Sequence, residues 1–149
     1  MARWERDPVL RRQLTWLLVT VEVLALTVNA YFVIAAYLRR VLVAVAPKLL
    51  SNDAFLAVVI VLTGIYFAAV VVQGYQFLRG RPWVRTAFLV QNSVWIVLGI
   101  LWFAHNLAGQ GNPNKFATWG GLLLPLVTLF PLIWPLLSLR PMAPVGGRG

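Results

Sequence analysis

The sequence predicts an all-α integral membrane protein, a four-transmembrane-helix bundle with up-down topology. Two observations lead to this fold class. Hydrophobic residues make up 60% of the chain and charged residues 11%, whereas charged residues make up about a quarter of a soluble domain. Four apolar runs are each long enough to cross a bilayer, and none alternates as a barrel strand does, so the backbone must be helical. No other stretch of the 149 residues is long enough for a soluble domain, so residues 1–149 are expected to form a single membrane domain.

The four spans are predicted at residues 14–38, 54–78, 83–107 and 117–139. Each has 23 to 25 residues, enough to cross about 30 Å of hydrocarbon with modest tilt. The first is too long for the apolar core of a signal peptide, so we expect an anchored helix. The apolar segment 41–50 is too short to cross. It either extends the first helix or lies on the membrane surface.

The connections differ in character. Residues 79–82 (Arg-Gly-Arg-Pro) predict a tight turn, so the second and third helices should be antiparallel neighbours. The fourth span contains Pro125, Pro131 and Pro135. Each leaves the carbonyl four residues earlier without its usual donor, which predicts a kinked helix. Residues 140–149 contain few core-forming side chains and are expected to be a flexible tail.

The formal charge of +9 is interpreted as an orientation signal. Nine basic residues flank the side of the two termini and four flank the other side, so the positive-inside rule predicts that both termini are cytoplasmic. Basic residues beside the spans meet anionic lipid headgroups, so we expect membrane lipids rather than nucleic acid as partners. The Arg-rich, Ala/Val/Leu-rich composition favours a multi-pass protein of the bacterial cytoplasmic (inner) membrane.

Several kinds of chemistry are excluded by residue type. The chain has no cysteine, which excludes disulfides, thiolate zinc sites and iron–sulfur clusters. The sequence contains no nucleophile–base pair, phosphate loop, paired carboxylates or metal-ligand cluster. We therefore expect no catalytic residues and no metal site, and the chain is not expected to be an enzyme.

Glu22 is the one charged residue within the first span. A charge at bilayer depth costs about 3 kcal/mol on insertion scales, so it must be neutralised, paired or hydrated. Thr15, Glu22 and Asn29 recur every seven residues, which places them in one polar stripe on the helix. We expect this stripe to face the bundle interior.

Partners for this stripe can be predicted from the depth of each residue in the membrane. Residues of the third and fourth spans reach the level of Glu22, given the common rise per residue. The resulting intramembrane polar cluster is predicted to contain Glu22, Asn29, Gln91, Asn92 and Thr128, with Ser93 as a further partner.

Two interpretations of Glu22 stay open. In the first, it is protonated or hydrogen-bonded to amides and holds helices together, at about 0.6–2 kcal/mol per contact. In the second, it is a proton- or cation-binding site on a transport path. The first is favoured because a relay usually contains several ionisable groups.

His105 is the only histidine, close to the outer end of the third span. A single imidazole would ligate a pigment or haem only together with a partner chain, and an interfacial hydrogen bond is the commoner role. No cofactor is therefore expected, although His105 is the candidate ligand.

The expected function is that of a non-catalytic structural or accessory subunit of a larger bacterial membrane protein complex, with other integral membrane subunits as partners. Two alternatives remain: a small transporter or channel component that uses Glu22, and a pigment- or haem-bearing subunit that ligates through His105.

Overall fold

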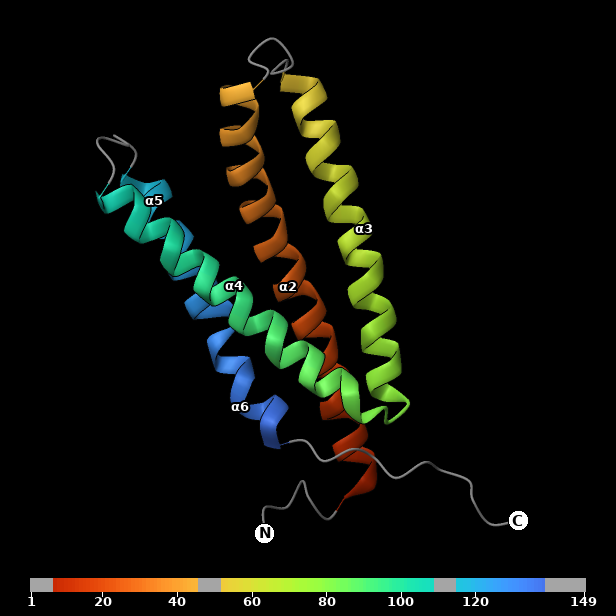
Figure 1. Ribbon diagram of the computed structural model, residues 1–149. Coiled ribbons are helices and arrows are strands. Elements are labelled where there is room, and N and C mark those ends of the chain that lie inside the picture. Colours follow the sequence, from red (N-terminus) through yellow and green to blue (C-terminus); the bar gives the residue numbers. More distant parts are fainter. Residues whose placement is uncertain (1–6, 46–51, 109–114, 139–149) are drawn as a thin grey trace.

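The computed structural model describes residues 7–45, 52–108 and 115–138, and this part of the chain is helical (Figure 1). The helices are α2 (Pro8–Val45), α3 (Asn52–Leu78), α4 (Pro82–Ala108), α5 (Lys115–Thr128) and α6 (Phe130–Ser138). Four stretches are long and apolar enough to cross a membrane, with α5 and α6 sharing the fourth. For these residues, the prediction of helices with four segments long and apolar enough to span a membrane is confirmed.

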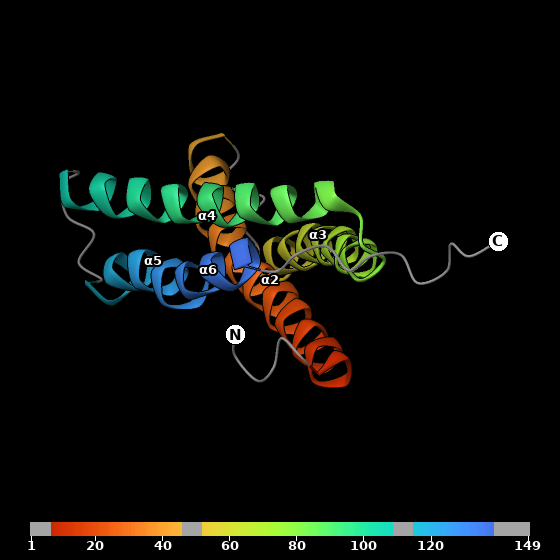
Figure 2. The same ribbon diagram turned by 90° about the horizontal axis from the view of Figure 1, so that it is seen from below.

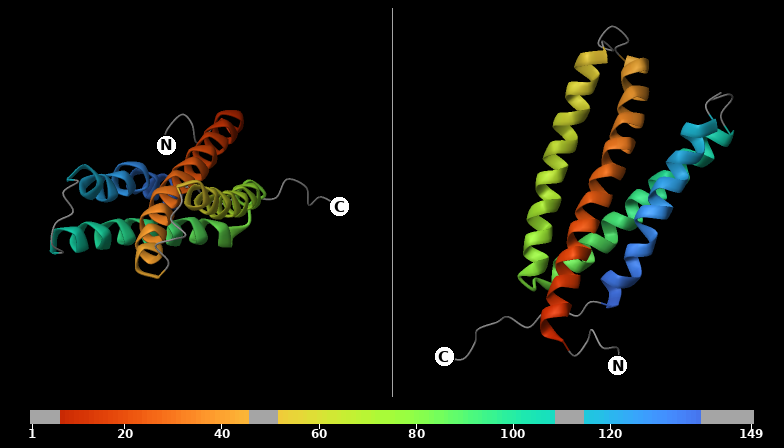
Figure 3. Two further views of the ribbon diagram at one scale, coloured as in Figure 1. Left: turned by 90° about the horizontal axis from the view of Figure 1, so that it is seen from above. Right: turned by 180° about the vertical axis from the view of Figure 1, so that it is seen from behind.

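The helices form two hairpins that cross. The first pairs α2 with α3, and the second pairs α4 with α5 and α6 (Figure 1). Seen from below, α4 and the α5–α6 segment lie alongside each other, and α2 crosses them at a steep angle (Figure 2). The views from above and from behind give the same arrangement (Figure 3). Helix α2 contacts all the other helices, so it is the central element of the bundle.

Helix α2 is longer than the predicted first span. It begins with Asp7, whose Oδ1 accepts hydrogen bonds from the backbone N–H groups of Val9 (2.9 Å) and Leu10 (3.3 Å). This is the N-cap arrangement, with Pro8 at the first helical position. The helix continues to Val45, so residues 41–45 extend it rather than start a separate surface helix. Residues 46–50 lie outside the described residues.

The predicted tight turn joins α3 to α4. Gly80 has a φ of 76°, a conformation that glycine adopts without strain. The N–H of Gly80 bonds the carbonyl of Phe77 (2.9 Å) and that of Arg81 bonds the carbonyl of Gln76 (3.2 Å), which is a Schellman motif. Yet α3 packs mainly on α2, and α4 mainly on α5. Helices α3 and α4 are therefore neighbours in sequence but move apart in space beyond the turn that joins them.

The fourth span is broken at Leu129, between α5 and α6. Pro131 has no N–H, so the carbonyl of Val127 loses its helical donor. The chain bridges the break through two backbone bonds, from Leu129 N to Pro125 O (2.9 Å) and from Leu132 N to Leu129 O (3.0 Å). Of the three prolines predicted to kink the fourth span, Pro131 follows the break, whereas Pro125 and Pro135 lie inside α5 and α6.

Glycines set the closest contacts within each hairpin. A Cβ on Gly99 would lie 2.6 Å from Cγ of Pro125 and 2.7 Å from the carbonyl oxygen of Gly121. Gly121 itself faces the ring of Trp102, and Gly74 faces Val19 of α2. Small residues let membrane helices approach this closely. In contrast, a Cβ on Gly64 would meet no atom within 4 Å.

Large side chains fill the region where the hairpins cross. The buried cluster includes residues from α2, α3, α4 and α6 together with the residue at the break, such as Leu26, Val70, Phe88, Leu129 and Leu136. Outside it, all helices expose large apolar side chains, as expected of a surface solvated by lipid. Helix α3 is the least buried of the four spans.

Candidate functional site

Glu22 lies at the centre of the bundle with an exposed fraction of 0%. Asn92 of α4, also 0% exposed, is the polar side chain that interacts with the Glu22 carboxyl. The two groups lack the geometry of a formed hydrogen bond, because both carboxyl oxygens and both amide atoms are without a partner. An unsatisfied buried polar group costs about 1–3 kcal/mol, and a charged one more. The pair as it stands therefore costs free energy at the bundle interior.

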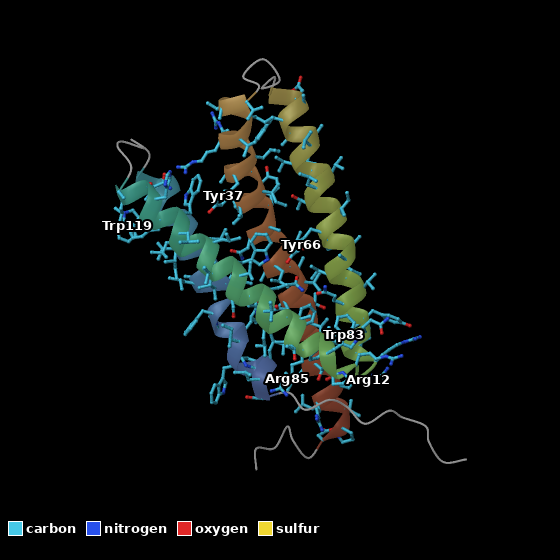
Figure 4. The ribbon with its side chains drawn as sticks, viewed as in Figure 1. Arg12, Tyr37, Tyr66, Trp83, Arg85 and Trp119 are labelled. Carbon is cyan, nitrogen blue, oxygen red and sulfur yellow. The ribbon has the colours of Figure 1, made fainter. Side chains whose placement is uncertain are left out.

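A separate chain of hydrogen bonds joins α3 to α4. Trp95 Nε1 donates to the Tyr66 hydroxyl (2.8 Å), which donates to Gln91 Oε1 (2.8 Å). The amide nitrogen of Gln91 donates in turn to Gln73 Oε1 (2.5 Å). Tyr66 lies near mid-height of the bundle (Figure 4). Consecutive hydrogen bonds polarise one another in a medium of low dielectric, so these four side chains act as one unit.

A third polar contact ties α2 to α5. Asn29 Nδ2 donates to Thr128 Oγ1 (2.7 Å) and to the carbonyl of Ala25 (2.8 Å). Thr128 donates its own proton to the carbonyl of Leu124 (2.7 Å). Asn29 is 1% exposed and its Oδ1 has no partner, so this contact is half satisfied.

The Asn29–Thr128 contact should contribute modestly to stability. Thr128→Val keeps the side-chain shape and removes the acceptor, and we expect a loss of about 0.6 kcal/mol, the average for interhelical hydrogen bonds in membranes. A double-mutant cycle with Asn29→Leu, measured by unfolding in mixed micelles, isolates the pairwise term. Additive effects of the two substitutions would show that the contact contributes nothing.

Arginines tie helices together at the two ends of the bundle: Arg40 links the two hairpins, and Arg85 links α4 to α6 within the second hairpin. At one end, Arg40 of α2 donates to Asn106 Oδ1 (3.0 Å) and lies 4.4 Å from the centre of the Trp102 ring. At the other end, Arg85 of α4 donates to the carbonyl of Leu137, in the last turn of α6; Figure 4 shows Arg85 beside α6. A cation there complements the helix dipole.

The structure brings the predicted polar residues together in three groups rather than one. In the first group, Glu22 faces Asn92. In the second, Gln91 hydrogen-bonds residues of α3. In the third, Asn29 donates a hydrogen bond to Thr128. The prediction that Ser93 faces the interior is wrong: Ser93 is exposed and bonds only the carbonyl of Leu89 in its own helix.

Other residues of the network escaped sequence reasoning. Neither Tyr66 nor Trp95 is among the predicted members of the cluster, although the indole N–H of Trp95 donates to the Tyr66 hydroxyl. An aromatic residue with a polar group near the middle of a span is the signal that would have identified both.

His105 lies exposed in the last turn of α4. Within the described part of the chain, His, Cys, Asp and Glu side chains form no group of three or more that would hold a metal ion. The polar side chains of the three groups are instead one carboxyl, four amides, one phenol, one indole and one hydroxyl, a set suited to holding helices together and to binding a proton.

Comparisons with protein-family models, with curated proteins and with solved structures found no match to this chain.

Proposed function

We propose that this chain is a non-catalytic structural or accessory subunit of a larger membrane protein complex in the bacterial cytoplasmic membrane. The observation that carries the proposal is the position of α3, which packs mainly on α2, bonds α4 through Tyr66 and Gln73, and exposes large apolar side chains over its remaining surface. Such a surface packs against a neighbouring membrane helix as readily as against lipid.

The exposed surface of α3 has a feature that suits a helix partner. Ala57, Gly64 and Ala68 are exposed and lie within about 40° of one another around the helix at 3.6 residues per turn. A Cβ on Gly64 would meet no atom within 4 Å. Small residues at such spacing allow two helix backbones to approach closely.

The proposed orientation has both termini in the cytoplasm. It rests on the excess of arginines and lysines on that side of the spans. It also accords with the start of α2 and the end of α6, which lie at the same end of the bundle (Figure 1).

The test compares two leucine substitutions on α3. After gentle detergent extraction and native mass spectrometry, the wild-type chain should retain an integral membrane subunit in fixed stoichiometry. Gly64→Leu should reduce the bound fraction at least tenfold, because it blocks close approach without touching the chain's own core. Ala69→Leu adds the same side chain farther around the helix and should leave binding unchanged. A wild-type chain that carries lipid alone would contradict the proposal.

The unpartnered Glu22 carboxyl supports a second candidate, a small transporter or channel component that uses this residue. Reconstituted vesicles separate the two functions. If Glu22→Gln abolishes proton- or cation-dependent flux and leaves assembly intact, the accessory function is wrong. If the wild-type chain supports no flux, the transport function is wrong.

A further inference from the structure

The four unpartnered polar atoms of the central pair complement one another chemically. They are the two oxygens of the Glu22 carboxyl and the oxygen and nitrogen of the Asn92 amide. An ionised carboxyl offers acceptors only, so it satisfies the amide N–H and leaves the amide oxygen facing another oxygen. A protonated carboxyl offers one donor and one acceptor, which matches the donor and acceptor of an amide.

No other described group at this level is available to Glu22. The Tyr66 hydroxyl interacts with Glu22 electrostatically, but it already donates to Gln91 and accepts from Trp95. Both ends of the Gln91 amide are bonded as well. Tyr66 is the ionisable side chain of α3 that acts on Glu22, and residues 118–138 of α5 and α6 contain no ionisable residue.

Charged groups of α2 and α4 lie elsewhere. On α4, Arg85 is seven residues before Asn92 in the sequence and bonds Leu137 of α6. On α2, the arginines that precede Glu22 most closely are Arg12 and Arg11, ten and eleven residues before it, about 15 Å along a helix. Asn92 is therefore the group that determines which form of the carboxyl fits.

We propose that Glu22 and Asn92 form an intramembrane proton-binding site, in which the protonated carboxyl and the amide make a closed pair of hydrogen bonds. The carboxyl O–H donates to Asn92 Oδ1, and Asn92 Nδ2 donates to the other carboxyl oxygen. On binding, a proton from water forms an O–H bond with one oxygen of the carboxylate. On release, that O–H bond breaks and the proton returns to water. Because α2 and α4 belong to different hairpins, release of the proton removes one of the two hydrogen bonds by which this pair links them. The site stands independently of the subunit function proposed above.

The experiment exploits a swap that conserves side-chain length. Glu22→Gln replaces the acid by an amide, and Gln with Asn still pairs through two hydrogen bonds, so this variant should fold. Adding Asn92→Asp moves the acid from α2 to α4 and keeps the same number of side-chain carbons. Infrared spectra of the purified full chain are recorded in lipid nanodiscs at neutral pH. Ordinary carboxyls are ionised at this pH, so the carbonyl stretch of a protonated carboxylic acid marks a carboxyl that holds its proton.

The wild-type chain should show one such band. Glu22→Gln should abolish it, the double variant should restore it, and Asp53→Asn, which changes an exposed carboxyl, should leave it unchanged. A wild-type spectrum without the band, a band that survives Glu22→Gln, or a double variant without the band would each overturn the proposal.

A second measurement needs no variant. Dicyclohexylcarbodiimide is added to native membranes and reacts with a protonated carboxyl. One of its nitrogens takes up the carboxyl proton while its central carbon bonds the carboxyl oxygen. The acyl group then migrates from that oxygen to the other nitrogen, and nothing is released. Peptide mapping should find a single adduct, on Glu22, at neutral pH. Absence of an adduct on Glu22 would contradict the proposal, as would equal labelling of Asp53.

Discussion

Gly99→Ala is expected to destabilise the bundle by about 1–3 kcal/mol, the usual cost of overpacking a close interface. The added Cβ would lie 2.6 Å from the Pro125 ring and 2.7 Å from the carbonyl oxygen of Gly121. Neither neighbour is the free end of a flexible side chain, so α4 and α5 must move apart. Denaturant titration in mixed micelles, followed by far-UV circular dichroism, measures the change in free energy of unfolding.

Gly120→Ala and Gly64→Ala are the matched controls. Both glycines are helical and a Cβ on either would meet no atom within 4 Å. Alanine is favoured over glycine within a helix by up to about 1 kcal/mol, so these variants should be unchanged or slightly more stable. Equal stability of Gly99→Ala and Gly120→Ala would show that the contact between α4 and α5 is not as close as described.

Gln91→Leu should have the second-largest effect, a loss of about 1–2 kcal/mol. Gln91 accepts from Tyr66 and donates to Gln73, and both of these partners lie on α3. Interhelical hydrogen bonds in membranes average about 0.6 kcal/mol and reach about 1.7. Because α3 and α4 share few other contacts, the same substitution should increase amide hydrogen exchange along the C-terminal half of α3.

Ser93→Ala provides the control two residues away. Its hydroxyl is exposed and bonds only its own helix, so both the free energy of unfolding and the exchange of α3 should stay at wild-type values. A Gln91→Leu variant that also matched the wild type in both measurements would mean that the network from Trp95 to Gln73 adds nothing to the packing of α3.

Most of the secondary structure was predictable because the bilayer imposes it. Long apolar runs without alternation must form helices that satisfy their own backbone. Gly80 with its neighbouring arginines indicated the turn, and the prolines of the fourth span indicated the break at Leu129. The length of α2 was not predictable, since the apolar residues that follow Arg40 suit either a longer helix or a surface segment.

The polar cluster was predictable in membership and depth but not in its pairing. Counting residues from the ends of the spans put Glu22 level with Asn92, and the structure has these two side chains interacting. The same counting could not tell which of the residues next to Asn92 also face Glu22. Adjacent residues differ by about 100° around a helix. Gln91 therefore points toward α3, Asn92 toward α2, and Ser93 away from the bundle.

The sequence by itself therefore determined four membrane-length helices, where they turn and break, and the depth of one costly carboxyl. Only the tertiary structure decided that α4 leaves α3 to pack on α5 through Gly99, and that Glu22 meets Asn92 without a formed hydrogen bond. Rise along a helix is fixed by backbone hydrogen bonding and can be counted from the sequence. Rotation and crossing angle are fixed by how side chains interlock with another helix, and that requires both helices at once.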